Sequence, residues 1–166
     1  MVTVRPSSDI TVGGWTNESG GATLYTSLND ASQNDATFIR SSDNPVADTA
    51  EVHLGSSGVL ADGTLKIAVG KGLNNAVVVN QRIALVQGTT EKAVWTYNDV
   101  AFGITLKTET LTGPQLASIS DFTDLRIRMM ADVGVGGGGF SSGFSTGFEV
   151  GTSSGFSSGF SMGFES

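Results

Sequence analysis

The sequence predicts an all-β protein, an antiparallel two-sheet sandwich of jelly-roll type, followed by a low-complexity C-terminal tail. Most of the first 132 residues fall into short runs in which apolar and polar residues alternate or β-branched residues dominate. Turn signals rich in Gly, Asn and Asp separate these runs about every 8–12 residues, a spacing typical of sandwiches. The composition then changes abruptly near Asp132. A closed barrel is the nearest alternative architecture.

Strands account for most of the predicted elements before Asp132. The clearest run is 50–54, because Ala50, Val52 and Leu54 share one face of an extended chain while Glu51 and His53 share the other. The same alternation recurs at 64–69. We expect strands at residues 3–5, 37–40, 50–54, 64–69, 76–86, 92–97, 100–111 and 125–130.

The connections between these strands carry more specific signals. Residues 80–82 are polar within the apolar run 76–86, which predicts a bend or bulge there. The sequence 87–90, Gln-Gly-Thr-Thr, predicts a hairpin. Short helical turns are expected at 24–29 and at 114–120, the second beginning with Pro114 after Thr112 or Gly113. Leu116 and Ile119 would then face the core.

The tail differs in composition from the rest of the chain. Residues 133–166 contain 11 Gly, 9 Ser and 6 Phe. We therefore divide the chain into a sandwich domain, 1–132, and a repeat tail, 133–166. Within the tail, residues 139–150 recur as 155–166 with 10 of 12 positions identical. Each copy carries a Phe at every fourth position, namely Phe140, Phe144, Phe148, Phe156, Phe160 and Phe164.

The spacing of four places the aromatic residues of one copy on one face of either a helix or a strand. A helix is disfavoured because each Gly costs about 1 kcal/mol relative to Ala, so a free tail should be disordered or extended. Burial of one Phe contributes on the order of 2 kcal/mol. Six Phe would offset much of the entropy lost when the tail docks. The repeats are therefore predicted to be assembly or anchoring segments.

Composition excludes several functions. The chain has no Cys and a single His, which rules out thiolate chemistry and multi-histidine metal sites. Its net charge of −7 argues against nucleic-acid binding. No apolar run reaches the length of a membrane span, and the N-terminus shows no signal-peptide pattern. No cofactor motif is present, since the Gly run 136–139 lacks the Lys and Ser or Thr of a phosphate loop.

Candidate catalytic and metal residues have simpler interpretations. His53 beside Glu51 would need a nucleophile, and no Gly-x-Ser-x-Gly motif supplies one, so we interpret it as a surface histidine. A hydrolase that uses His53 or loop carboxylates is the weakest alternative. No calcium-loop motif joins the loop acids, and a turn-capping role is expected for Asp121 and Asp124. The acids near predicted loops are Asp43, Asp48, Asp62, Asp121, Asp124 and Asp132.

Four aromatic residues could stack on a sugar: Trp15, Tyr25, Trp95 and Tyr97. Trp95 and Tyr97 share a face and are interpreted as core. Trp15 follows Gly13-Gly14 in a loop, which makes it the candidate ligand-facing aromatic. Packing of Trp15 over the end of the sandwich is nevertheless the favoured interpretation.

Three stretches resemble small phage and prophage β-sandwich proteins of the virion. They are Val4-Arg5-Pro6-Ser7-Ser8-Asp9 with Gly14-Trp15-Thr16, then Leu85-Val86-Gln87-Gly88-Thr89-Thr90 with Trp95-Thr96, and finally Ile119-Ser120-Asp121-Phe122 with Asp124-Leu125-Arg126-Ile127-Arg128. The resemblance covers roughly residues 3–130 and involves fold-forming positions. It implies a capsid decoration protein or a tail or fibre module, and it implies no active site.

Together these observations predict a non-enzymatic virion structural protein, assembled in the host cytoplasm. It would bind neighbouring copies and other virion proteins through its Phe repeats, without a cofactor, a membrane span or nucleic acid. The alternative is a carbohydrate-binding adhesin module on the virion surface, with a surface glycan as its ligand.

Overall fold

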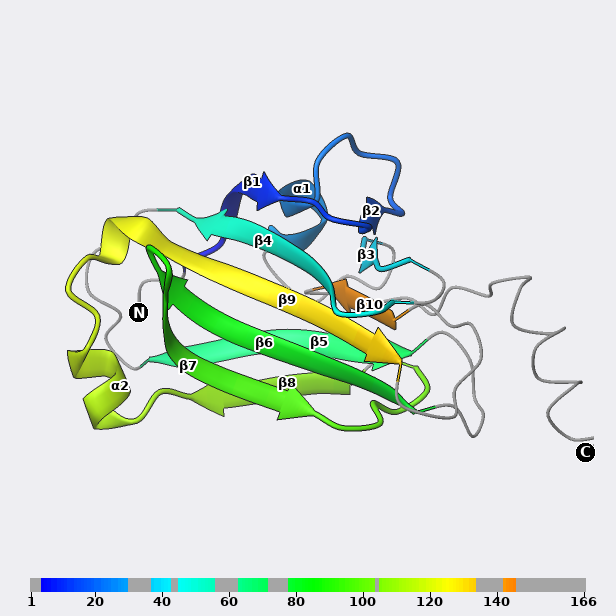
Figure 1. The fold of residues 1–166 in the computed structure, drawn as a ribbon. Coiled ribbons are helices and arrows are strands. Elements are labelled where there is room, and N and C mark those ends of the chain that lie inside the picture. The colour runs from blue at the N-terminus through cyan, green and yellow to red at the C-terminus, as the bar shows by residue number, and fades with distance from the viewer. Residues whose placement is uncertain are drawn as a thin grey trace, which may run out of the picture.

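The computed structural model of the chain describes residues 4–29, 37–42, 45–55, 63–71, 78–103, 105–133 and, by their backbone, 142–145. These residues form antiparallel sheets with a few short helices, which confirms the predicted all-β class (Figure 1). The described strands form two separate sheets, so the closed-barrel alternative is wrong for this part of the chain.

The first sheet has the strand order β1-β4-β9-β6-β7, with β9 at its centre. Its strands are β1 (Pro6–Thr11), β4 (Asp48–Leu54), β9 (Leu125–Val133), β6 (Val79–Gln87) and β7 (Thr90–Tyr97). The second sheet has the order β2-β3-β10-β5-β8. Its strands are β2 (Thr16–Asn17), β3 (Ile39–Arg40), β10 (Ser142–Ser145), β5 (Thr64–Lys71) and β8 (Thr105–Thr110).

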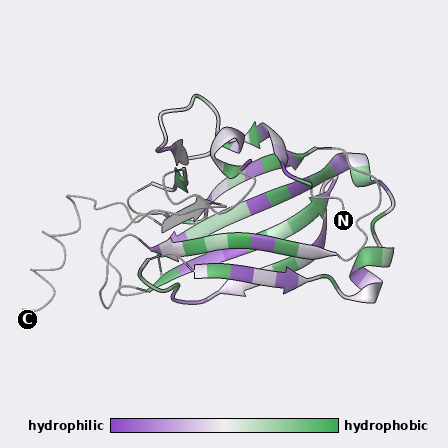
Figure 2. Cartoon of the chain, turned by 180° about the vertical axis from the view of Figure 1, so that it is seen from behind, coloured by the Kyte–Doolittle hydropathy of each residue, from purple (hydrophilic) through white to green (hydrophobic). Residues whose placement is uncertain are grey.

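Both sheets contribute to one hydrophobic core. In the first sheet the alternation predicted for 50–54 is confirmed, because Ala50 and Val52 are fully buried in that core. The second sheet adds Ile39, Ile67 and Val69. Figure 2 shows the resulting alternation of hydrophobic and hydrophilic residues along the strands. The alternation is regular in β9, whose residues are buried at every second position from Leu125 to Ala131, as expected for an antiparallel sheet that is solvated on its other side.

The hairpin and the second helical turn lie where the sequence predicts them. Gln87 pairs with Thr90 around Gly88, which has a φ of +60°. Helix α2 (Gly113–Ala117) begins with a capping box between Thr112 and Gln115, and Ile119 is buried beyond its end. The predicted turn at 24–29 is helix α1 (Tyr25–Leu28).

Carboxylates that accept from backbone N–H groups stabilise the shorter elements. The N-terminus of α1 is held by Asp9 of β1, whose carboxylate accepts from the backbone N–H groups of Leu24 and Tyr25 at 2.8 Å each. The 3₁₀ turn η1 (Phe122–Asp124) is capped by Asp121, which confirms the capping role expected for that residue. Its carboxylate accepts from the Thr123 hydroxyl at 2.6 Å and from Thr123 N at 2.8 Å, and these bonds lower the pKa of Asp121.

Two details of the first sheet differ from the sequence prediction. The first strand runs from Pro6 to Thr11 rather than over 3–5, and it is an edge strand, where Pro is tolerated. Residues 80–82 pair regularly, and the irregularity of the β6–β7 pairing lies between Leu85 and Val86. Gln81 keeps its place on the buried face because its Nε2 donates to Gly70 O at 3.1 Å.

The second half of β5 is buried on both faces, whereas its sequence predicts one buried face. Ala68 lies on the side opposite Ile67 and Val69 but is fully buried as well. Ala68 belongs to a central strand, where it pairs with Leu106 of β8 on one side and Ser145 of β10 on the other.

Candidate assembly site

The most informative feature of the fold is the position of β10. Residues 142–145 belong to the first copy of the tail repeat, and they lie between β3 and β5 in the second sheet (orange in Figure 1). Among the described residues β3 and β5 pair with β10 and not with each other. The strand position between β3 and β5, called the acceptor slot below, is therefore filled by the tail.

The register of β10 is defined on both sides. Gly143 lies opposite Arg40 of β3 and Gly70 of β5, and Phe144 lies opposite Ile39 and Val69. Ile39 and Val69 are almost completely buried. The slot thus combines two antiparallel backbone edges with apolar residues at its centre.

Polar contacts fix the β5 side of the slot. Lys71, opposite Ser142, is only 6 % exposed, and its Nζ lies 2.6 Å from Asp99 Oδ1. Its backbone N–H donates to Ala101 O, and its carbonyl accepts from Gly103 N. Asp99 adopts a positive φ of +48°, and its N–H donates to Asn80 Oδ1. The loop after β7 therefore holds the end of β5 in place.

The β3 side of the slot is held by the segment around Glu18. Glu18 donates its backbone N–H to Phe38 O at 3.1 Å and forms an ion pair with Arg40 at 3.2 Å. Thr16 of β2 pairs with Arg40 and donates its hydroxyl to Glu18 at 2.6 Å. These contacts stabilise a strand of two residues that could not persist alone.

Of the six predicted anchoring residues, Phe144 is the one whose backbone is described. Phe140, Phe148, Phe156, Phe160 and Phe164 lie outside the described residues, and their role stays a prediction. The sequence left open whether the Phe repeat is helical or extended, and 142–145 are extended. What sequence reasoning missed is that this strand occupies the chain's own sheet. The even spacing of Phe was the available signal.

Trp15 is buried, as the packing interpretation expects, and the alternative of an exposed, ligand-facing aromatic at this position is wrong. It is 2 % exposed, and its indole N–H donates to Asp48 O at 3.2 Å. Asp48 also binds the backbone before Trp15, because Gly14 N donates to Asp48 Oδ1 at 2.9 Å. Trp15 borders a shallow hollow of about 330 Å³ beside Val12 and Asn17. Its ring offers no flat face for sugar stacking.

Tyr97 and Trp95 pack against the core, as the sequence predicts. The Tyr97 hydroxyl donates to Glu109 of β8 at 3.1 Å, which links the edge strands of the two sheets. Burial raises the pKa of Tyr97, and the adjacent Glu109 carboxylate adds to this effect. Lys107 Nζ lies 5.6 Å from the centre of the same ring. This aromatic ring is therefore part of the bridge between β7 and β8.

His53 faces away from the core on β4 and lies close to one hydroxyl. Ser7 Oγ is 3.4 Å from His53 Nδ1 and donates to the His53 carbonyl at 3.3 Å. This serine is exposed and donates to the backbone, and among the described residues no carboxylate is hydrogen-bonded to His53 in the way that a Ser-His hydrolase site requires.

The loop acids have structural partners. Asp48 also accepts from Ser42 N and Oγ, Asp132 accepts from Ala47 N, and Asp124 binds Arg126. Asp43 and Asp62 lie outside the described residues. Within the described part of the chain, no three acidic or histidine side chains gather into a metal-binding group.

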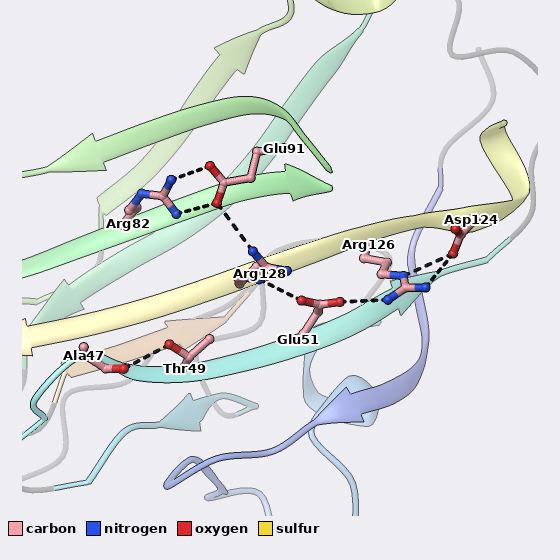
Figure 3. A network of polar contacts seen from close by, with 8 residues as sticks. All are labelled: Ala47, Thr49, Glu51, Arg82, Glu91, Asp124, Arg126 and Arg128. Atoms are coloured by element: carbon pink, nitrogen blue, oxygen red, sulfur yellow. Dashed lines mark hydrogen bonds and ion pairs between the residues drawn. The ribbon is translucent and has the colours of Figure 1, made fainter. Parts of the chain in front are cut away.

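A network of charged residues covers the outer face of the first sheet (Figure 3). Glu51 accepts from Arg126 Nη1 at 3.2 Å and from Arg128 Nε at 2.8 Å. Glu91 accepts two bonds from Arg82, at 2.9 and 2.6 Å, which lower the pKa of Glu91. Arg128 Nη1 also lies 3.5 Å from Glu91. The network joins β4, β9, β6 and β7 across their strand edges.

Comparison of the chain with protein-family models, with curated protein sequences and with solved structures found no match. None of the helices in the described residues has the length and apolar character needed to cross a membrane. Neither result assigns a chemistry to the chain.

Proposed function

We propose that this chain is a non-enzymatic structural protein of a virion, a capsid decoration protein or a tail-fibre component. Its C-terminal Phe repeats would anchor it to neighbouring copies and to other virion proteins, and it would assemble in the host cytoplasm. The observation that carries the proposal is β10, because a repeat segment of the tail takes a central position in a sheet. Strand addition is a recognised mode of protein association.

The proposal includes a jelly-roll sandwich as the body of the module. Seven of the nine connections between successive described strands pass from one sheet to the other, and only β2–β3 and β6–β7 stay within a sheet. Such crossing connections are typical of Greek-key and jelly-roll sandwiches. The shared core of the two sheets also supports a sandwich.

Solution mass tests the anchoring role of the tail. Full-length chain should be larger than a monomer in light scattering, whereas Phe156→Ser/Phe160→Ser/Phe164→Ser should shift it toward monomer because the aromatic residues of the second copy are lost. This variant leaves β10 untouched. A truncation after residue 132 is a poorer test, because it also removes a strand from the second sheet. A wild-type chain that stays monomeric up to its solubility limit would contradict assembly through the tail.

The virion assignment has its own test. Particles purified from a culture that produces this chain should contain it in a fixed ratio to the major shell protein, measured by quantitative mass spectrometry. Its absence from washed particles would exclude a virion component, whatever the oligomeric state in solution.

A further inference from the structure

The tail contains more copies of the β10 sequence than the sheet has places for this strand. The four residues of β10 read Ser-Gly-Phe-Ser, and the same tetrapeptide occurs at 142–145, 154–157 and 158–161. The third occurrence is the direct counterpart of β10 in the 16-residue repeat. One acceptor slot between β3 and β5 therefore faces three identical candidate strands.

The slot can accept any of the three segments on equal terms. Pairing in an antiparallel ladder uses backbone N–H and C=O groups, which are independent of side-chain identity. Because the four side chains are also identical, the packing of the inserted strand would not distinguish the segments. The same chain therefore carries two further segments with the sequence that the slot accepts.

We infer that the acceptor slot is an exchange site that also takes a Ser-Gly-Phe-Ser segment from the tail of a second copy. This inference rests on the proposed assembly function, since it requires copies at high local density. Exchange of an identical element between protomers is a low-cost route to association, because the same contacts form within and between chains. The slot filled from the same chain and the slot filled from a second copy differ in the effective concentration of the strand, which tethering sets within one chain.

The length of the tail permits this exchange. Thirteen positions separate Ser145 from Ser158, which corresponds to at most about 45 Å of extended chain. A domain of roughly 130 residues has a diameter of about 35–40 Å. A chain whose own slot holds 142–145 can thus present 158–161 to the slot of a copy in contact with it.

Disulfide trapping tests the exchange, because the chain has no cysteine of its own. Gly143 lies opposite Arg40, and directly opposed residues of antiparallel strands have the Cα separation that a disulfide needs. A tagged full-length chain with Arg40→Cys is mixed with an untagged full-length chain with Gly159→Cys and oxidised mildly. We expect a mixed disulfide dimer on a non-reducing gel, at several times the yield obtained with Gly151→Cys, a tail glycine outside every Ser-Gly-Phe-Ser segment.

A single chain with both Arg40→Cys and Gly143→Cys checks the register, because it should close its own disulfide. If that bond forms while Gly159→Cys gives no more mixed dimer than Gly151→Cys, exchange between copies is refuted. The proposed function would not be refuted by that result, because the light-scattering experiment tests it separately. If the bond within one chain does not form, the acceptor slot is not filled by 142–145 and the inference fails at its first step.

Discussion

Replacement of Glu51 by glutamine tests whether the charged network holds the first sheet together. Glu51 lies on β4 and accepts hydrogen bonds from Arg126 and Arg128 of the adjacent strand β9. Glutamine keeps the size of the side chain but removes its charge. The two arginines, which lie two residues apart on one face of β9, then lose their common counter-ion.

The expected loss lies between the limits for exposed and buried ion pairs. Exposed pairs contribute about 0.2–1 kcal/mol, whereas removal of one partner from a buried pair costs about 3–5 kcal/mol. The Glu51 side chain is 9 % exposed, but its partners Arg126 and Arg128 are 26 % and 29 % exposed. Each arginine also keeps a second acid, Asp124 or Glu91. We therefore expect a loss of about 2 kcal/mol in the free energy of unfolding.

Thermal and urea unfolding, followed by tryptophan fluorescence, measure this loss. For a chain of this length about 2 kcal/mol lowers Tm by roughly 4–8 °C. Asp124→Asn is the matched control, because Asp124 is 38 % exposed and binds Arg126 at the edge of the network. Its effect should stay below about 1 kcal/mol and shrink further in high salt.

An unfolding free energy of Glu51→Gln within error of wild type would refute this reasoning. So would a larger loss in Asp124→Asn than in Glu51→Gln, because burial of the carboxylate is the basis for ranking the two variants. By the same reasoning, Arg128→Gln should lower the free energy of unfolding less than Glu51→Gln does, because Glu51 keeps its ion pair with Arg126.

Three further predictions concern β10, a glycine turn and pH. Gly143→Pro combined with Gly155→Pro and Gly159→Pro should lower the unfolding free energy by about 2–4 kcal/mol, because proline removes a ladder donor from every Ser-Gly-Phe-Ser segment that could fill the slot; Gly159→Pro alone should leave urea unfolding unaltered. Gly13→Ala should lower the free energy of unfolding by about 2–4 kcal/mol, because the new Cβ would clash with Thr49 O at a φ of +57°. Gly20→Ala, whose Cβ meets no atom within 4 Å, should lower it by about 1 kcal/mol. Equal losses of Tm in the two variants would contradict this reasoning. The pKa of Glu91 is lowered in the folded state, so its stabilisation is present above its ordinary value of 4.5 and is lost as the pH falls through the lowered folded value; the Tm gap between wild type and Glu91→Gln should be largest near pH 7 and close in acid.

Local patterns predicted the elements of the first sheet well where one face is buried. The alternation at 50–54 and the hairpin at 87–90 both depend on neighbouring residues, and both lie where expected. The sequence predicted a bulge at 80–82, whereas the irregularity lies between Leu85 and Val86. Residues 80–82 continue the strand because the Gln81 side chain donates to Gly70 O of another strand. That partner is distant in sequence, and no local pattern contains it.

Trp15 shows the same limit at a site residue. Its loop position and preceding glycines are compatible with either exposure or packing. Asp48, more than thirty residues away, decides between them by accepting hydrogen bonds from Gly14 N and the Trp15 indole. The close approach of Gly13 and Gly14 to residues 48 and 49 leaves no room for side chains at either position.

The amino-acid sequence by itself determined the antiparallel all-β class, the faces of the strands and the repeated Phe segments of the tail, because these follow from periodicity and composition. Only the tertiary structure decided how the strands outside the β6–β7 hairpin pair, that Trp15 is buried, and that residues 142–145 lie between β3 and β5. Strand pairing joins backbone groups that are far apart in the chain, and those groups are the same in every residue. The identity of a strand's partner is therefore settled by the packing of the whole sheet.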